Sequence, residues 1–123
     1  MRIEIIDGIK YRLDEDKLTA EVCQKMGYKG DIIIPETVVF NEVTYRVTRI
    51  AEKTFDECKS LTSIVIPDSV TSIRESAFQD CSSLTTITFN GTKAQWNRIE
   101  LGEDWNDNVP ARVVHCTDGD VEI

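Results

Sequence analysis

The sequence predicts a β-rich α/β solenoid, a short stack of repeated strand-and-turn units with a cap at each end. Residues 47–66 and 70–89 align at an offset of 23 residues with ten of twenty positions identical. Matched apolar residues at a fixed period stack into ladders, so each unit covers the open apolar face of the previous one. An apolar residue at every second position of 64–66 and 87–89 indicates a strand in each unit.

Each repeat is predicted to hold a strand, a second extended piece and a helical turn. The strand of residues 61–66 ends at Pro67, because proline cannot donate to the next ladder hydrogen bond. Residues 70–73 form the second extended piece, and residues 75–79 are expected to make one or two helical turns with Phe78 as an apolar contact. The two copies place these apolar or small residues in equivalent positions: Val47 and Val70, Ile50 and Ile73, Phe55 and Phe78, Cys58 and Cys81, Leu61 and Leu84, Ile64 and Ile87.

An earlier unit is present in an imperfect form. Residues 31–38 match residues 63–70, but the two prolines lie 32 residues apart, nine more than the repeat. The extra residues, near 39–46, carry apolar residues on both sides of Asn41-Glu42 and predict an inserted β-hairpin. We therefore divide the single domain 1–123 into an N-terminal β cap (1–30), repeats (31–90) and a C-terminal cap (91–123).

The two ends are predicted to cover the stack. At the start, apolar residues flank Asp7-Gly8, a turn dipeptide typical of a β-hairpin, and residues 18–23 and 28–34 add further strands. These segments form a β-hairpin N-terminal cap.

The C-terminal cap is predicted to be a helix followed by a strand. Thr92 is a good N-cap for a helix of residues 93–99, which places Trp96 and Ile99 on one face. The last strand is expected at 112–116, and Asp118-Gly119 is expected to turn the tail outward.

The repeat resembles a known family. The run Ile66 to Ile73 (IPDSVTSI), then Ala77-Phe78 and Cys81 to Leu84 (CSSL), resembles the BspA-like, or Treponema-type, leucine-rich repeats of bacterial surface proteins. The resemblance covers residues 31–90, and the end of the chain is similar to the closing segment of gut-bacterial members. Arg74 stands where the family usually has glycine. The resemblance implies a leucine-rich repeat stack and a binding role at the cell surface or in secreted form.

The composition and the N-terminal residues limit the partners and the location that we expect for the protein. Fourteen Lys and Arg against 22 Asp and Glu give a net charge of −8, which disfavours nucleic acid as a partner. No apolar run reaches the roughly 18 residues that membrane insertion requires. Met1 to Lys10 does not read as a secretory signal peptide, so a cytoplasmic location is expected if Met1 is the native start.

No catalytic, metal-binding or cofactor-binding residues are predicted. The one histidine, His115, is next to Cys116 in a predicted strand, so the two side chains point to opposite faces and do not suit a Cys–His hydrolase. Cys58 and Cys81 are expected in an interior ladder. The acidic C-terminal third lacks a calcium-loop spacing and is expected to be a solvated surface.

The predicted function is therefore a non-enzymatic interaction module. Its partner is an unknown protein or a glycan, and self-association through an exposed sheet edge is a further possibility. The alternative is a small cytoplasmic repeat protein that self-associates or binds an intracellular partner. The candidate binding residues share the outward, concave side of the predicted strands: Asp31, Ile33, Ser63, Val65, Thr86, Thr88 and His115.

Overall fold

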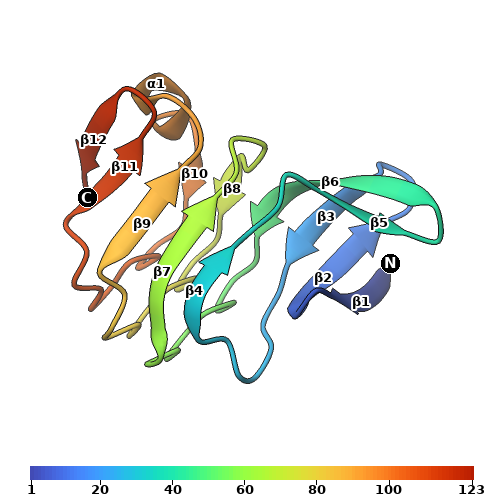
Figure 1. The fold of residues 1–123 in the computed structure, drawn as a ribbon, viewed down its shortest axis with the longest axis horizontal. Helices are drawn as coiled ribbons and strands as arrows, with labels where there is room; N and C mark the ends of the chain where they lie inside the picture. Colours follow the sequence, from blue (N-terminus) through green and yellow to red (C-terminus); the bar gives the residue numbers. More distant parts are fainter.

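The computed structural model describes residues 1–123 and is a solenoid of two β-sheets with one short helix (Figure 1). The chain winds between the two sheets in about four turns, and the colours of Figure 1 run from blue to red along the stack. The predicted fold class is confirmed. Parallel strands joined by crossovers require both sheets to share one interior, so the core lies between them.

One sheet has five strands. Four are parallel and the last is antiparallel, in the order β12-β11-β9-β7-β4. Its inward row joins Ile32, Ile64, Ile87 and Val114, so the sequence repeat becomes an apolar ladder across four strands. The strands are β4 (Gly30–Ile33), β7 (Leu61–Ile66), β9 (Thr86–Phe89), β11 (Val113–Cys116) and β12 (Gly119–Glu122).

The other sheet has seven strands and contains both predicted hairpins. Asp7-Gly8 and Asn41-Glu42 each place two consecutive residues at positive φ, which is the type I′ turn that suits the twist of a hairpin. The path runs β1-β2-β3-β6-β8-β10, and β5 pairs with β6. The strands are β1 (Arg2–Ile6), β2 (Ile9–Asp14), β3 (Thr19–Val22), β5 (Thr37–Phe40), β6 (Val43–Ile50), β8 (Ser72–Ile73) and β10 (Glu100–Leu101).

The helical turns predicted at residues 75–79 are wrong. This segment is a series of turns in which Ser76 and Asp80 have φ of 56° and 60°. Lys53 and Glu57 repeat the pattern in the preceding loop. A left-handed residue every four positions breaks a helix, and the N–H groups of Lys53 and Glu57 instead donate to carbonyl oxygens of the next loop, at 3.1 and 2.8 Å. The loops form a third hydrogen-bonded stack beside the sheets.

The region predicted as the C-terminal cap holds a further turn of the stack. The strand β10 pairs in parallel with β8, and Asp104 and Asn108 repeat the left-handed pattern of the loops. The helix α1 (Lys93–Trp96) begins at the predicted N-cap Thr92, with a complete capping box. It ends three residues before the predicted Ile99, because the chain must leave the helix to reach β10. This insertion lengthens the period and conceals the repeat in the sequence.

The predicted outward tail is also wrong. The chain turns at Thr117-Asp118 and returns as β12, which pairs antiparallel with β11, whose first residue is Val113 rather than the predicted Arg112. Val121 lies opposite Val114 and packs against the core with Ile123. Burial of these two apolar side chains favours the folded-back tail.

An aromatic column runs along the axis of the core. The ring centroids of Tyr28 and Phe55 are 4.8 Å apart, those of Phe55 and Phe78 are 5.1 Å apart, and those of Phe78 and Trp105 are 6.2 Å apart. Trp105 then contacts Trp96 of α1, at 5.7 Å between centroids. Successive turns of the solenoid contribute one ring each to this column.

Candidate binding surface

The outer face of the five-stranded sheet, which we name the open face, carries all seven candidate residues. One row across the strands joins Asp31, Ser63 and Thr86. The second row joins Ile33, Val65, Thr88 and His115. Alternate residues of a strand point to opposite sides, so these side chains face outward while the isoleucine ladder fills the core. The structure brings the seven residues together, and their role in binding stays a prediction.

Asp31 forms the acidic corner of the open face. Its Oδ1 accepts hydrogen bonds from Ser63 Oγ at 2.7 Å and Thr62 Oγ1 at 3.1 Å. Both bonds favour the charged carboxylate, so the hydroxyl of Ser63 first and that of Thr62 second lower the pKa of Asp31. The two bonds hold the carboxylate toward β7 while Asp31 stays exposed to solvent.

The opposite corner pairs an imidazole with a carboxylate. His115 Nδ1 lies 2.8 Å from Asp120 Oδ1, and both side chains are exposed. Asp120 and Glu122 reach the open face because β12 folds back on β11. The sequence pattern did not indicate either residue, because the return of β12 depends on the burial of Val121 against the core.

The middle of the open face is uncharged. Val65 and Thr88 are half-buried neighbours on adjacent strands, with exposed Thr86 beside them. Their short side chains leave the sheet surface accessible. The open face therefore offers an apolar and hydroxyl centre between two polar corners, which suits contact with another macromolecule better than proton transfer.

The four cysteines are free thiols. Cys81 is fully buried, and its Sγ lies 2.9 Å from the backbone oxygen of Phe55. Burial raises the pKa of the Cys81 thiol to about 12 and also raises the pKa of Cys23, Cys58 and Cys116. A thiol is nucleophilic only as the thiolate, so none of the four is activated for chemistry.

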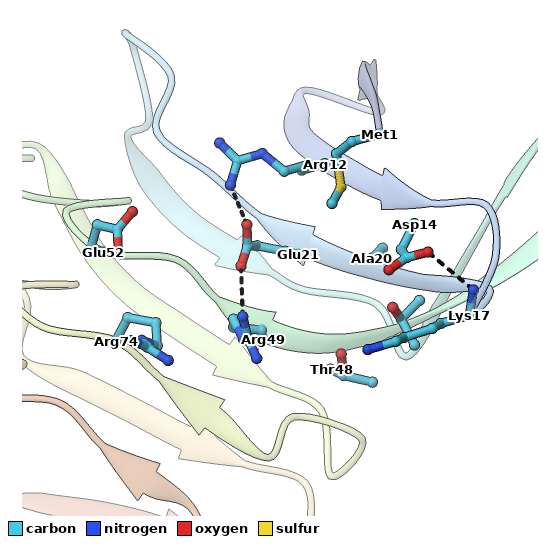
Figure 2. A pocket seen from close by; sticks show the side chains of 11 residues that line it. Met1, Arg12, Asp14, Lys17, Ala20, Glu21, Thr48, Arg49, Glu52 and Arg74 are labelled. Atoms are coloured by element: carbon cyan, nitrogen blue, oxygen red, sulfur yellow. Dashed lines mark hydrogen bonds and ion pairs between the residues drawn. The ribbon is translucent and has the colours of Figure 1, made fainter.

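A polar pocket of about 440 Å³ lies on the outer face of the seven-stranded sheet. Figure 2 shows the Glu21 carboxylate between Arg12 and Arg49, with Arg49 Nη1 at 3.6 Å from Glu21 Oε2. Arg74, the departure from the family's glycine, lines the same pocket. Four cations face three carboxylates here, so little net charge remains to attract an anion: Arg12, Lys17, Arg49 and Arg74 against Asp14, Glu21 and Glu52.

Two further features bear on function. No three histidine, cysteine or carboxylate side chains converge in a way that could hold a metal ion. The helix α1 spans four residues, and no helix in the structure has the length and apolarity that a membrane crossing requires.

Comparison with known proteins establishes the family. A model described as the BspA type leucine rich repeat region matches residues 35–99, more than half of the chain. The chain therefore belongs to the BspA-type leucine-rich repeat family, and the predicted resemblance is confirmed. No curated protein matches significantly.

Three solved structures share the fold. A leucine rich cell surface protein from Faecalibacterium prausnitzii is 28% identical with a TM-score of 0.62, over 90% of this chain and 25% of its own. A leucine-rich repeat protein from Bacteroides ovatus is 31% identical with a TM-score of 0.63, and the match covers 71% of this chain and 23% of that protein. A leucine-rich repeat protein from Bacteroides capillosus is 22% identical with a TM-score of 0.68, and the match covers 94% of this chain and 99% of that protein. This chain thus spans about a quarter of the first two proteins.

Proposed function

We propose that the chain is a protein-binding module of the bacterial cell surface and that it binds its partner through the open face. Leucine-rich repeat proteins of this family and fold are typically non-catalytic binding modules. The similarity to the cell surface protein from Faecalibacterium prausnitzii supports the location.

The observation that carries this proposal is the uninterrupted second row of the open face. From Ile33 through Val65 and Thr88 to His115, four parallel strands present one residue each at the same height. At the usual spacing between strands, the row is about 14 Å wide. This width suits one secondary-structure element of a partner, whose apolar side chains would cover Val65 while its polar groups meet the two corners.

The rest of the surface supports the same assignment. The outer face of the seven-stranded sheet is occupied by ion pairs among its own side chains, such as that of Arg49 with Glu21. Val65 and Thr88 have no such competing partners. A binding partner therefore displaces fewer existing interactions on the open face than on the opposite one.

Retention of envelope and host extracellular-matrix proteins by the immobilised chain tests the proposal. Thr88→Arg places a long charged side chain at the centre of the open face, and we expect it to reduce specific retention at least tenfold. Thr48→Arg, on the other sheet, is the matched control and should retain the same proteins as the wild type. Equal retention by both variants would remove the open face as the binding surface.

A further inference from the structure

The outer edge of β4 is an unpaired strand edge at the N-terminal end of the five-stranded sheet. β4 pairs with β7 alone. The N–H of Ile34 donates to the carbonyl oxygen of Val65, on the β7 side. Because successive residues of a strand direct their backbone groups to opposite edges, the N–H and C=O groups of Asp31 and Ile33 face away from β7. These are the groups that a further strand would use.

This edge lacks the protection found at the other end of the same sheet. At that end, β12 carries Asp120 and Glu122 with Asp118 just before it, and charges on an edge strand oppose strand addition. In contrast, β4 presents Ile33, a residue that is 69% exposed. Its one carboxylate, on Asp31, is drawn toward β7 by its two hydrogen bonds.

A groove accompanies the edge. A cavity of about 420 Å³ lies between the start of β2 and the end of β4, and six of its nine lining residues are apolar, among them Tyr11, Ile33 and Val39. A second cavity of about 320 Å³ shares Asp7, Ile9 and Ile33 with the first and continues along β4. The β1–β2 turn forms the wall that faces the strand. A slot with walls on both sides admits one extended chain and excludes the whole sheet edge of a second copy.

Charged side chains of both signs line one end of the groove. Lys25 and Lys29 line the second cavity, and neither ammonium group forms an ion pair. Lys25 lies over the ring of Tyr28 at 5.0 Å. Asp7 and Asp31 line the same cavity, so two carboxylates balance the two ammonium groups. The groove therefore has no excess of either charge, and its apolar lining is what selects the occupant.

We propose that the β4 edge binds an extended segment of a partner protein as an added strand, with apolar side chains in the groove. Strand addition supplies main-chain hydrogen bonds for affinity, while the groove selects alternate side chains. This site borders the open face and shares Asp31 and Ile33 with it, but it uses the backbone groups of the β4 edge, so the proposal stands whether or not the open face binds a partner.

Fluorescence anisotropy tests the proposal with a labelled seven-residue peptide in which valine and threonine alternate. We expect saturable binding and shifts of the amide resonances of residues 31–33. A peptide with alternate backbone nitrogens methylated keeps its side chains but cannot pair on one edge, and we expect it to bind at least tenfold more weakly. Equal binding of the methylated peptide, or none of the parent at millimolar concentration, would overturn the proposal.

Matched variants separate the edge from other surfaces. Ile33→Pro removes the outward N–H and leaves the bond of Ile34 with Val65, so it should weaken peptide binding at least tenfold. Leu101→Pro removes an N–H that faces away from β8 in the terminal strand β10, and it should not change binding. Loss of binding in Thr88→Arg would instead assign the peptide to the open face.

Sedimentation of the chain alone completes the test. The peptide proposal predicts a monomer at all concentrations. A dimer that Ile33→Pro abolishes would show that a second copy occupies the edge and would overturn the assignment to a partner peptide.

Discussion

The rings of Phe55 and Phe78 stack with their planes 6° from parallel and their centroids 5.1 Å apart. The two residues lie 23 positions apart, which is the period of the sequence repeat, so the contact joins equivalent positions of successive turns. Both side chains are fully buried. The contact shows how the solenoid is stabilised: each turn adds an aromatic ring to the column and covers the ring before it.

Phe78 occupies the centre of this column, between Phe55 and Trp105, and we expect Phe78→Ala to lower the free energy of unfolding by about 3–5 kcal/mol. The substitution removes contacts on both faces of the ring and leaves a cavity. Val65→Ser on the open face should cost much less. Urea unfolding of both variants measures the difference, and the reverse order would contradict the side-chain orientations reported for these two positions.

Gly102 lies against the backbone of the preceding turn. A Cβ at this position would lie 2.2 Å from the backbone nitrogen of Glu75, and the backbone cannot move aside as a flexible side chain can. We expect Gly102→Ala to lower the stability by roughly 1–3 kcal/mol. Thermal unfolding checks this, with Glu103→Ala at an exposed neighbouring position as the control. A wild-type melting temperature in Gly102→Ala would show that the last turn can separate from β8 without cost.

The pKa of Asp31 is a measure of the hydrogen bonds at the acidic corner of the open face. The hydrogen bonds from Ser63 and Thr62 lower its pKa in the folded protein, so its stabilising contribution is present above the unfolded value near 4. That contribution is lost as the pH falls through the lower folded pKa. Carbon-13 NMR of the carboxyl group should show the low pKa, and Ser63→Ala should raise it. Thr88→Ala, on the same face but without contact to Asp31, should leave the titration unchanged.

The thiols should differ in their reaction with a disulfide reagent. Burial raises the pKa of Cys81 to about 12, and its side chain has no solvent exposure, so we expect modification of Cys81 to require unfolding of the stack. Cys116 is less buried and should react faster at pH 8. Variants that keep one cysteine each allow the two rates to be measured separately. Similar rates in native buffer would show that the stack opens near Cys81.

Much of the open face could be predicted from the sequence because it depends on local alternation. Ile64 and Ile66 are matched by Ile87 and Phe89, so the residue between each pair, Val65 or Thr88, must point outward. The alternation of 113–116 added His115 to the same row. Asp120 could not be placed in this way. The return of β12 depends on burial of Val121 against core residues that lie elsewhere in the chain.

The loops show why the helical prediction failed. Ala77 and Phe78 are compatible with a helical turn, and nothing local opposes one. The left-handed residues Ser76 and Asp80 are tolerated because the N–H groups at these positions donate to the next turn, to the carbonyl oxygens of Glu103 and Asp107 at 3.0 and 2.9 Å. Those acceptors are 27 residues further along the chain.

The sequence by itself determined the repeat, the inward ladders and both hairpins, because period, alternation and turn chemistry are written in neighbouring residues. Only the tertiary structure decided the left-handed loops, the turn of the stack that contains Trp105, and the strand β12. These features depend on hydrogen bonds and burial between residues that are distant in the chain. The unpaired edge of β4 belongs to the same group, since a strand edge is free or occupied according to what lies beside it in space.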